Sequence, residues 1–354
     1  MAESALSEKA LSVCSSVNDA AWHDLSGDGA YECWHFDAVS DDGREALVVN
    51  FYDNYVLSPR YHDRVKLGVR SLNDGSTMTR VPAVSFTYAV EGKAVCRAVN
   101  EFRAGEFKAD TDRIGVKIGG SEFHSDTVEY GTGYLLKLNL RTVRGRHINA
   151  ELEWLFVESN LMPPKEYDAD LVWNIVAPRS DVSGRISLIG SRGETRKLVH
   201  FRGTGYHDHL RCTTSRSDSR GTRVWGRAHF IDTTAIFSQT EQGEEKTLKL
   251  FLVRDGEMSE MDMSVENKDV RRGFRNRLSF MADGLELKID AQRKISSDPS
   301  ESTMLSNVML NFSDKDSRHA KGLTGLIEPS PPSNGLSRWI ADLPIGREGR
   351  SPLF

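Results

Sequence analysis

Short stretches in which apolar and polar residues alternate run through this chain, and this pattern most limits what it can fold into. Residues 134–141 read YLLKLNLR, which places Leu136, Leu138 and Leu140 on one face of an extended strand. Comparable stretches recur with turn residues roughly every 8–12 positions. This spacing is typical of antiparallel barrels and sandwiches, and 354 residues are enough for two of them. The predicted fold class is all-β, with two antiparallel β-barrel or β-sandwich domains packed together.

The clearest interruption of the strand pattern is the sequence ESNLMPPKEYDAD at residues 158–170, which carries two prolines. It predicts a domain boundary. The expected organisation is an N-terminal segment at 1–20, a first β-domain at 21–162 and a second β-domain at 163–354. Helical patterns are weak, and only 6–15 and 336–343 are candidates.

Composition narrows the classes of function. The formal net charge is −5, with 38% hydrophobic and 27% charged residues, so the sequence predicts a globular protein that does not bind nucleic acid. Four cysteines lack any Cys-x-x-Cys pair, and no apolar run is long enough to span a membrane. We therefore expect a cytoplasmic protein, while its oligomeric state is not determined by the sequence.

Familiar catalytic signatures do not occur. The chain has no HExxH, no GxSxG and no glycine-rich loop that ends in Lys-Ser or Lys-Thr. The sequence accordingly predicts chemistry without a metal or an organic cofactor.

The stretch GTGYHDHL at residues 203–210 places three ionisable side chains in a row behind a tyrosine. If the backbone is extended, His207 and His209 share one face of the strand. Two histidines at this spacing can ligate a metal, but no third ligand has a compelling spacing. The alternatives are two strand histidines that bond to nearby backbone, or a role in holding Asp208 or a loop.

On the other face of that strand, Tyr206 and Asp208 would lie together with Leu210. An aspartate that faces an apolar interior resists ionisation, so its pKa rises and it can donate a proton near neutral pH, with Tyr206 holding it or relaying the proton. The alternative is that Asp208 caps a turn made by the two glycines. The pattern favours neither of these readings.

Five stretches together resemble one family, and their order along the chain matches the family's order. They are GAYECWHFDAVSDDG at 29–43, NFYDNYVLSPRY at 50–61, VWNIVAPRSDVSGRI at 172–186, FRGTGYHDH at 201–209 and VWGRAHF at 224–230. The chain resembles carotenoid 1,2-hydratases, also called hydroxyneurosporene synthases, and their lipocalin-like relatives. More distantly it is similar to decalin-forming Diels–Alderases.

The resemblance implies two lipocalin-like β-domains with a pocket between or within them, and catalysis without a cofactor. It implies that Asp208 protonates a carbon–carbon double bond with Tyr206 beside it, and that the indole of Trp173 stabilises a carbocation. Relatives continue the motif as HDHNWG, whereas this chain has HDHLRC. A leucine at 210 predicts a drier pocket, which favours cyclisation or isomerisation over hydration.

The remaining predicted substrate-binding residues are aromatic. Trp225 opens the sequence WGRAHF, in which Gly226 permits close backbone approach. Trp34 and Tyr55 lie in the matching stretches, and His207 and His209 complete the set.

The predicted function is a cofactor-independent enzyme that protonates a double bond of a hydrophobic isoprenoid or polyene. The outcome would be cyclisation, isomerisation or hydration in natural-product biosynthesis. The alternatives are a pericyclase that only folds a polyene into a reactive conformation, and a non-catalytic lipid-binding protein. The expected partner is a hydrophobic small molecule, and a peripheral membrane contact for its uptake stays open.

Overall fold

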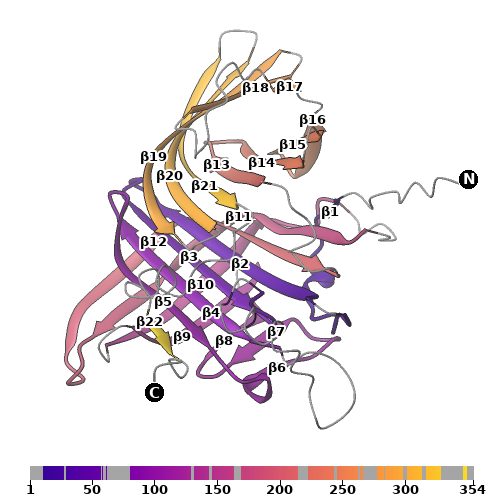
Figure 1. Cartoon of the computed structure of the whole chain (residues 1–354). Coiled ribbons are helices and arrows are strands. Elements are labelled where there is room, and N and C mark those ends of the chain that lie inside the picture. The colour runs from indigo at the N-terminus through magenta and orange to yellow at the C-terminus, as the bar shows by residue number, and fades with distance from the viewer. Residues whose placement is uncertain are drawn as a thin grey trace, which may run out of the picture.

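The computed structural model shows two curled, almost wholly antiparallel β-sheets (Figure 1). The described residues are 11–27, 29–56, 58, 61, 80–128, 131–142, 146–162, 169–213, 222–242, 245–261, 264–265, 277–282, 284–297, 301–312, 316–327 and 346–348. This architecture confirms the all-β expectation, and each sheet forms a half-barrel.

The larger sheet has 13 strands. In spatial order they are β22 (Gly346–Glu348), β5 (Lys93–Glu101), β4 (Ala83–Val90), β3 (Glu45–Tyr52), β2 (Tyr31–Ser40), β12 (Thr195–Cys212), β11 (Leu171–Ile189), β10 (His147–Glu158), β9 (Gly131–Arg141), β8 (Ser121–Val128), β7 (Gly115–Ile118) and β6 (Phe107–Ala109). The short strand β1 (Ser12–Cys14) pairs in parallel with β11 off this path.

The smaller sheet has nine strands and is built from residues 222–327. In spatial order they are β16 (Glu257–Met261), β15 (Glu245–Arg254), β14 (Thr234–Gln242), β13 (Thr222–His229), β21 (Ser317–Ile327), β20 (Glu301–Phe312), β19 (Leu285–Ser297), β18 (Arg277–Ala282) and β17 (Ser264–Val265).

The alternation seen in the sequence builds the core of the larger sheet. Leu140 on β9 lies opposite Ile148 on β10, and Leu138 lies opposite Ala150. All four side chains are buried, while their neighbours along each strand face outward. Each buried leucine or isoleucine contributes roughly 1.5–3 kcal/mol relative to an exposed one, which fixes the register of the pair.

The smaller sheet packs on the outer face of the larger one (Figure 1). Two apolar patches join them. One patch brings Trp173, Ile175 and Tyr206 against Ile236, Phe251 and Val253. The other brings Val39, Ala46, Val48 and Ala89 against Ile295, Leu305 and Leu323. Both faces of the larger sheet are thus covered near β2, β11 and β12, one by its own core and one by the smaller sheet.

Sheet membership divides the chain at a different place from the expected 162/163 boundary. That boundary falls between β10 and β11, which pair with each other over most of their length. The last residue of the larger sheet before the chain enters the smaller one is Cys212, and Thr222 begins β13. The physical reason is that β12 pairs with β11 on one edge and with β2 on the other.

The helical elements bounded within the described residues are two short 3₁₀ turns, η1 (Asn18–Ala20) and η2 (Ala104–Glu106), and Tyr61 is also helical. The helix expected at 6–15 is wrong in its described part, where Ser12–Cys14 is strand β1. The one expected at 336–343 lies outside the described residues. Within those residues, no helix has the length and apolar character that a membrane crossing requires.

Candidate active site

The stretch from Gly203 to Leu210 lies in the middle of β12 and is extended throughout, so it is not a turn. The two glycines instead permit close packing. A Cβ atom on Gly205 would lie 2.4 Å from Val182 Cγ2, and one on Gly203 would lie 2.2 Å from the carbonyl oxygen of Val39. The reading of Asp208 as a turn cap is therefore wrong.

Asp208 accepts two hydrogen bonds on the same carboxyl oxygen. The Trp173 indole Nε1–H donates to Asp208 Oδ2 at 2.8 Å, and the Tyr206 hydroxyl donates to Oδ2 at 2.9 Å. Tyr206 comes from the same face of β12, and Trp173 comes from the neighbouring β11. Burial, followed by the charge of Asp208, raises the pKa of Tyr206 well above its ordinary value, so this phenol keeps its proton and remains a donor.

This Asp208 cluster lies between the two sheets and not inside a barrel, which corrects the inward direction expected from Leu210. Tyr206 and Trp173 are buried against the smaller sheet, where the ring of Trp173 meets Phe251 edge-on at 6.0 Å. Asp208 itself is half-buried. The inner face of β12 is the one that carries His207 and His209 into the core of the larger sheet.

Two guanidinium groups from β13 lie over the aromatic members of the cluster. Arg223 lies 5.1 Å from the Trp173 ring centroid, and Arg227 lies 5.3 Å from that of Tyr206. Such cation–π contacts are worth about 0.5–2 kcal/mol each, depending on exposure to water. They place positive charge from the smaller sheet beside the acidic group of the larger one.

Arg227 forms a buried ion pair with Asp37 of β2, whose other oxygen lies 2.9 Å from His35 Nε2. Burial lowers the pKa of Arg227 to about 9, which leaves it cationic at neutral pH. Two arginines close to Asp208 in the chain also have their ion pairs elsewhere: Arg202 meets Asp41 at 3.6 Å.

Arg211 is the second of these, and it meets Asp19 at 2.6 Å. Arg202, Arg211 and Arg227 thus have carboxylates other than Asp208 as their ion-pair partners.

Trp225 on β13 also approaches the larger sheet. Its ring meets His35 edge-on at 5.1 Å. The adjacent Gly226 packs closely, because a Cβ there would lie 2.6 Å from Phe237 Cζ. Trp225 therefore lies at the interface between the sheets, and a role in substrate binding stays a prediction.

Of the other predicted binding residues, three lie on the far face of β12 and β2 from Asp208. His207 stacks on Phe36 with centroids 3.9 Å apart, and burial lowers its pKa well below the ordinary range. His209 stacks on Trp34 at 4.5 Å. These residues belong to the core of the larger sheet and are not brought together with the acid.

Tyr55 is buried beside Tyr52, with ring centroids 4.8 Å apart. It belongs to an apolar cluster against which Leu210 packs, and Leu210 also packs on the patch that holds Tyr206. Leu210 thus connects the apolar cluster of Tyr55 with the patch that contains Tyr206.

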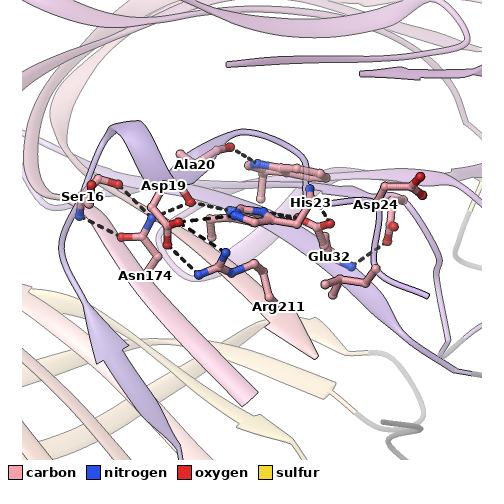
Figure 2. Close-up of polar contacts among 12 residues, drawn as sticks. Ser16, Asp19, Ala20, His23, Asp24, Glu32, Asn174 and Arg211 are labelled. Carbon is pink, nitrogen blue, oxygen red and sulfur yellow. Dashed lines mark hydrogen bonds and ion pairs between the residues drawn. The ribbon is translucent and has the colours of Figure 1, made fainter. Parts of the chain in front are cut away.

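A second polar cluster, which sequence reasoning missed, gathers around Glu32 on the inner face of the larger sheet (Figure 2). Glu32 Oε2 lies 3.2 Å from His23 Nδ1 and 2.9 Å from His209 Nε2. Although burial opposes it, hydrogen bonds from His209 and His23 lower the pKa of Glu32 to about 2. Burial lowers the pKa of His209, whereas contacts with Asp19 and Glu32 overcome burial and raise that of His23.

A polar hollow of about 420 Å³ lies at another part of the larger sheet. It is lined by Asn100, Phe102, Glu106, Lys108, Lys117, Gly119, Gly120, Asn139 and Arg141. None of the predicted site residues lines it, and its charged lining residues do not suit a hydrophobic substrate.

Two half-barrel antiparallel sheets packed face against face define a lipocalin-like fold. Comparison by sequence and by structure places the chain in this fold class. It is 22% identical over 353 residues to a protein named hydroxyneurosporene dehydrogenase from Chlorobaculum tepidum, covering 93% of this chain and 91% of that protein. This confirms the family resemblance found in the sequence. No family model matches the chain.

Solved structures share the fold. A crystal structure of CghA with Sch210972 superposes with a TM-score of 0.55 at 14% identity, over 89% of this chain and 98% of CghA. A putative AttH from Nitrosomonas europaea superposes with a TM-score of 0.58 at 14% identity, over 88% and 95% of the two chains. At this identity the likeness establishes the fold alone.

Proposed function

We propose that this protein is an enzyme in which Asp208 protonates a carbon–carbon double bond of a hydrophobic isoprenoid or polyene. The observation that carries the proposal is that Trp173 and Tyr206 both donate to Oδ2 of Asp208. Because Oδ2 accepts two hydrogen bonds, Oδ1 is the oxygen that would carry a transferable proton in the proposed acid.

The two donors also assist the step in which charge develops. When the proton leaves Oδ1, the carboxylate becomes anionic and both hydrogen bonds become charge-assisted. Hydrogen bonds to charged groups are worth about 1.5–3 kcal/mol, against about 1 kcal/mol for neutral ones. Arg223 and Arg227 lie over the rings of the two donors and add positive potential. The arrangement favours the state after proton transfer over the state before it, which is the condition for catalysis.

The chemistry balances without a further reagent. One alkene carbon takes the proton of Asp208, and its neighbour becomes a carbocation. Water, an internal hydroxyl or a second double bond of the substrate then attacks that carbon. The intermediate loses a proton to the Asp208 carboxylate, which restores the acid. The products are an alcohol, an ether ring or a carbocycle.

Trp173 takes a different role here from the one the family resemblance implies. Its N–H is engaged with Asp208 and Arg223 lies over its ring, so we propose that it mainly orients the acid. Tyr206 supports the acid from the same strand.

Acyclic carotenoids are the first substrates to test, because the relative from Chlorobaculum tepidum carries hydroxyneurosporene in its name. Purified protein would be incubated in D₂O with neurosporene, hydroxyneurosporene and shorter polyenes, and products would be analysed by mass spectrometry. We expect one deuterium on carbon in each product. Asp208→Asn should lower the rate at least about 100-fold, the scale of general acid catalysis. Asp181→Asn, an exposed position on β11, is the matched control.

Other outcomes separate the alternatives. An isomerised product without deuterium, formed equally fast by Asp208→Asn, would identify a pericyclase. Tight binding of a polyene that is never converted would identify a carrier. Mass spectrometry of ligands extracted from the purified protein would name the substrate class in either case.

A further inference from the structure

We propose that His23, Glu32 and His209 form a binding site for a divalent transition-metal ion, with Zn²⁺ as the best match. The three come from separate segments: His23 precedes β2, Glu32 lies on β2 and His209 on β12. Their ligand atoms all lie within 4.8 Å of one another. Two imidazoles and one carboxylate are a donor set that suits zinc and leaves a fourth position for water.

The spacing of the ligand atoms fits such an ion. Glu32 Oε2 lies 3.2 Å from His23 Nδ1 and 2.9 Å from His209 Nε2. Metal–ligand bonds of about 2.0–2.1 Å in tetrahedral geometry put neighbouring ligand atoms roughly 3.3 Å apart. Shifts of a few tenths of an ångström at Glu32 therefore bring these two pairs to coordination distance.

The contacts of His209 are compatible with a cation between it and Glu32. The ring is fully buried, its Nε2 faces Glu32 Oε2 at 2.9 Å, and its Nδ1 lies 3.4 Å from the carbonyl oxygen of Asp19. In the tautomer that carries the proton on Nδ1, that N–H donates to the carbonyl and Nε2 presents a lone pair toward the carboxylate. A metal ion between the two groups would then accept electron pairs from both.

Outer contacts hold both histidines in the orientation that ligation requires, and Figure 2 shows those of His23. His23 Nε2 lies 3.4 Å from Asp19 Oδ1, which leaves Nδ1 for the ion. The backbone N–H of His23 donates to Glu32 Oε1 at 2.9 Å, so the other carboxylate oxygen is directed to the ion. Trp34 stacks on His209 with an interplanar angle of 9°. Metal-bound histidines characteristically have such partners on the second ring nitrogen.

The surrounding charges leave a net attraction for a cation. Arg211 approaches the cluster, but its guanidinium is paired with the Asp19 carboxylate at 2.6 Å. Asp53 accepts the backbone N–H of Glu32 and is itself paired with Arg80. The two charges within each of these ion pairs cancel, and Glu32 remains as the negative charge at the site.

An ion here would tie the segment around η1 to β2 and β12. It lies on the face of β12 opposite Asp208, so the inferred site is independent of the proposed acid chemistry. It also departs from the expectation that the protein needs no metal, because Glu32 and His23 supply the ligands that sequence spacing did not reveal.

The test uses the full chain without a histidine tag. The protein is stripped with a chelator and titrated with Zn²⁺ by calorimetry, and metal content is measured in parallel. We expect one Zn²⁺ per chain and a raised melting temperature on binding. His23→Gln, at a partly exposed position, should weaken affinity by more than about 100-fold. Asp19→Asn should weaken it by about 10–100-fold, the usual effect of removing an outer partner.

His200→Gln, at an exposed position of β12, is the matched control and should bind Zn²⁺ like the wild type. The inference is overturned if the wild type shows no saturable site, or if His23→Gln binds as tightly as the wild type. Either result would mean that a proton, not a metal, bridges Glu32 and His209. Activity is not a readout here, so failure of the proposed reaction would not affect the outcome.

Discussion

The indole N–H of Trp173 and the carboxyl of Asp208 face each other across neighbouring strands, with 2.8 Å between Nε1 and Oδ2. Trp173 lies opposite Leu210 in the β11–β12 register, so it meets Asp208 from the diagonal position. An interaction set by strand register can be removed by a small change that leaves the sheet intact.

Trp173→Phe and Tyr206→Phe each remove one hydrogen bond to Asp208 and keep an aromatic ring. If both bonds strengthen in the transition state, each change should lower kcat by about 10–100-fold with the Michaelis constant nearly unchanged, since the net worth is about 1.5–3 kcal/mol. Steady-state kinetics on the identified substrate would measure this, with circular dichroism as the check on folding. Equal kcat values in the variants and the wild type would mean that the donors only pack the interface.

Trp225→Phe tests whether this residue contacts the substrate. Its ring lies against His35 at the interface and has no contact with Asp208 among the described interactions. A substrate contact should appear as a several-fold rise in the Michaelis constant with kcat preserved, because uniform binding is lost. A lower melting temperature with unchanged kinetics would instead assign Trp225 to core packing.

Removing only one partner of the buried ion pair between Arg227 and Asp37 should strongly destabilise the folded protein. Both side chains are almost fully buried, so Arg227→Met leaves the Asp37 carboxylate without its arginine partner and should lower the free energy of unfolding by about 3–5 kcal/mol. The double variant Arg227→Met, Asp37→Leu removes both charges and should recover at least half of that loss. Urea unfolding of the three variants, including Asp37→Leu alone, completes the cycle.

We expect the burial of His229 to make the folded protein less stable in acid. Burial, followed by the charges of Arg227 and Arg179, lowers its pKa well below the ordinary value of 6.5. In the unfolded chain the ring takes up a proton near that value, whereas in the folded protein it stays neutral. The unfolded state therefore binds more protons as the pH falls below 6.5, and the free energy of unfolding decreases.

His229→Gln removes this group's contribution to the pH dependence. Between about pH 7 and pH 5, the unfolding free energy of the variant should fall less steeply than that of the wild type, by at most about 1.4 kcal/mol per pH unit. Urea titrations at three pH values measure both slopes. Parallel slopes would contradict the prediction and indicate that the folded protein admits the protonated ring.

Local periodicity alone was enough to determine the fold class and the pairing of Tyr206 with Asp208. Side chains on an extended strand alternate with a period of two, so residues 206 and 208 share a face in any sheet that contains them. The same rule puts His207 and His209 together on the opposite face, as the structure has them. These features depend only on residues close in sequence.

Tertiary structure decided which face of β12 points into the core of the larger sheet and which faces the smaller sheet. Leu210 indicated an apolar environment for Asp208, but β12 is covered on both sides, by its own half-barrel and by the smaller sheet. An apolar neighbour therefore cannot tell the inside of a barrel from the interface between two sheets. The two prolines near residue 162 mark a break between strands. They did not reveal that β11 and β12, which follow the break, pair within the larger sheet.

The meeting of Glu32 with His23 and His209 also depended on tertiary structure. No spacing rule links them, because strand pairing between β2 and β12 and the path of the chain around η1 bring them together. Sequence determines the period of a strand and the chemistry of its side chains. Long-range pairing determines which of those side chains meet, since its free energy comes from burial summed over whole sheets and not from any local motif.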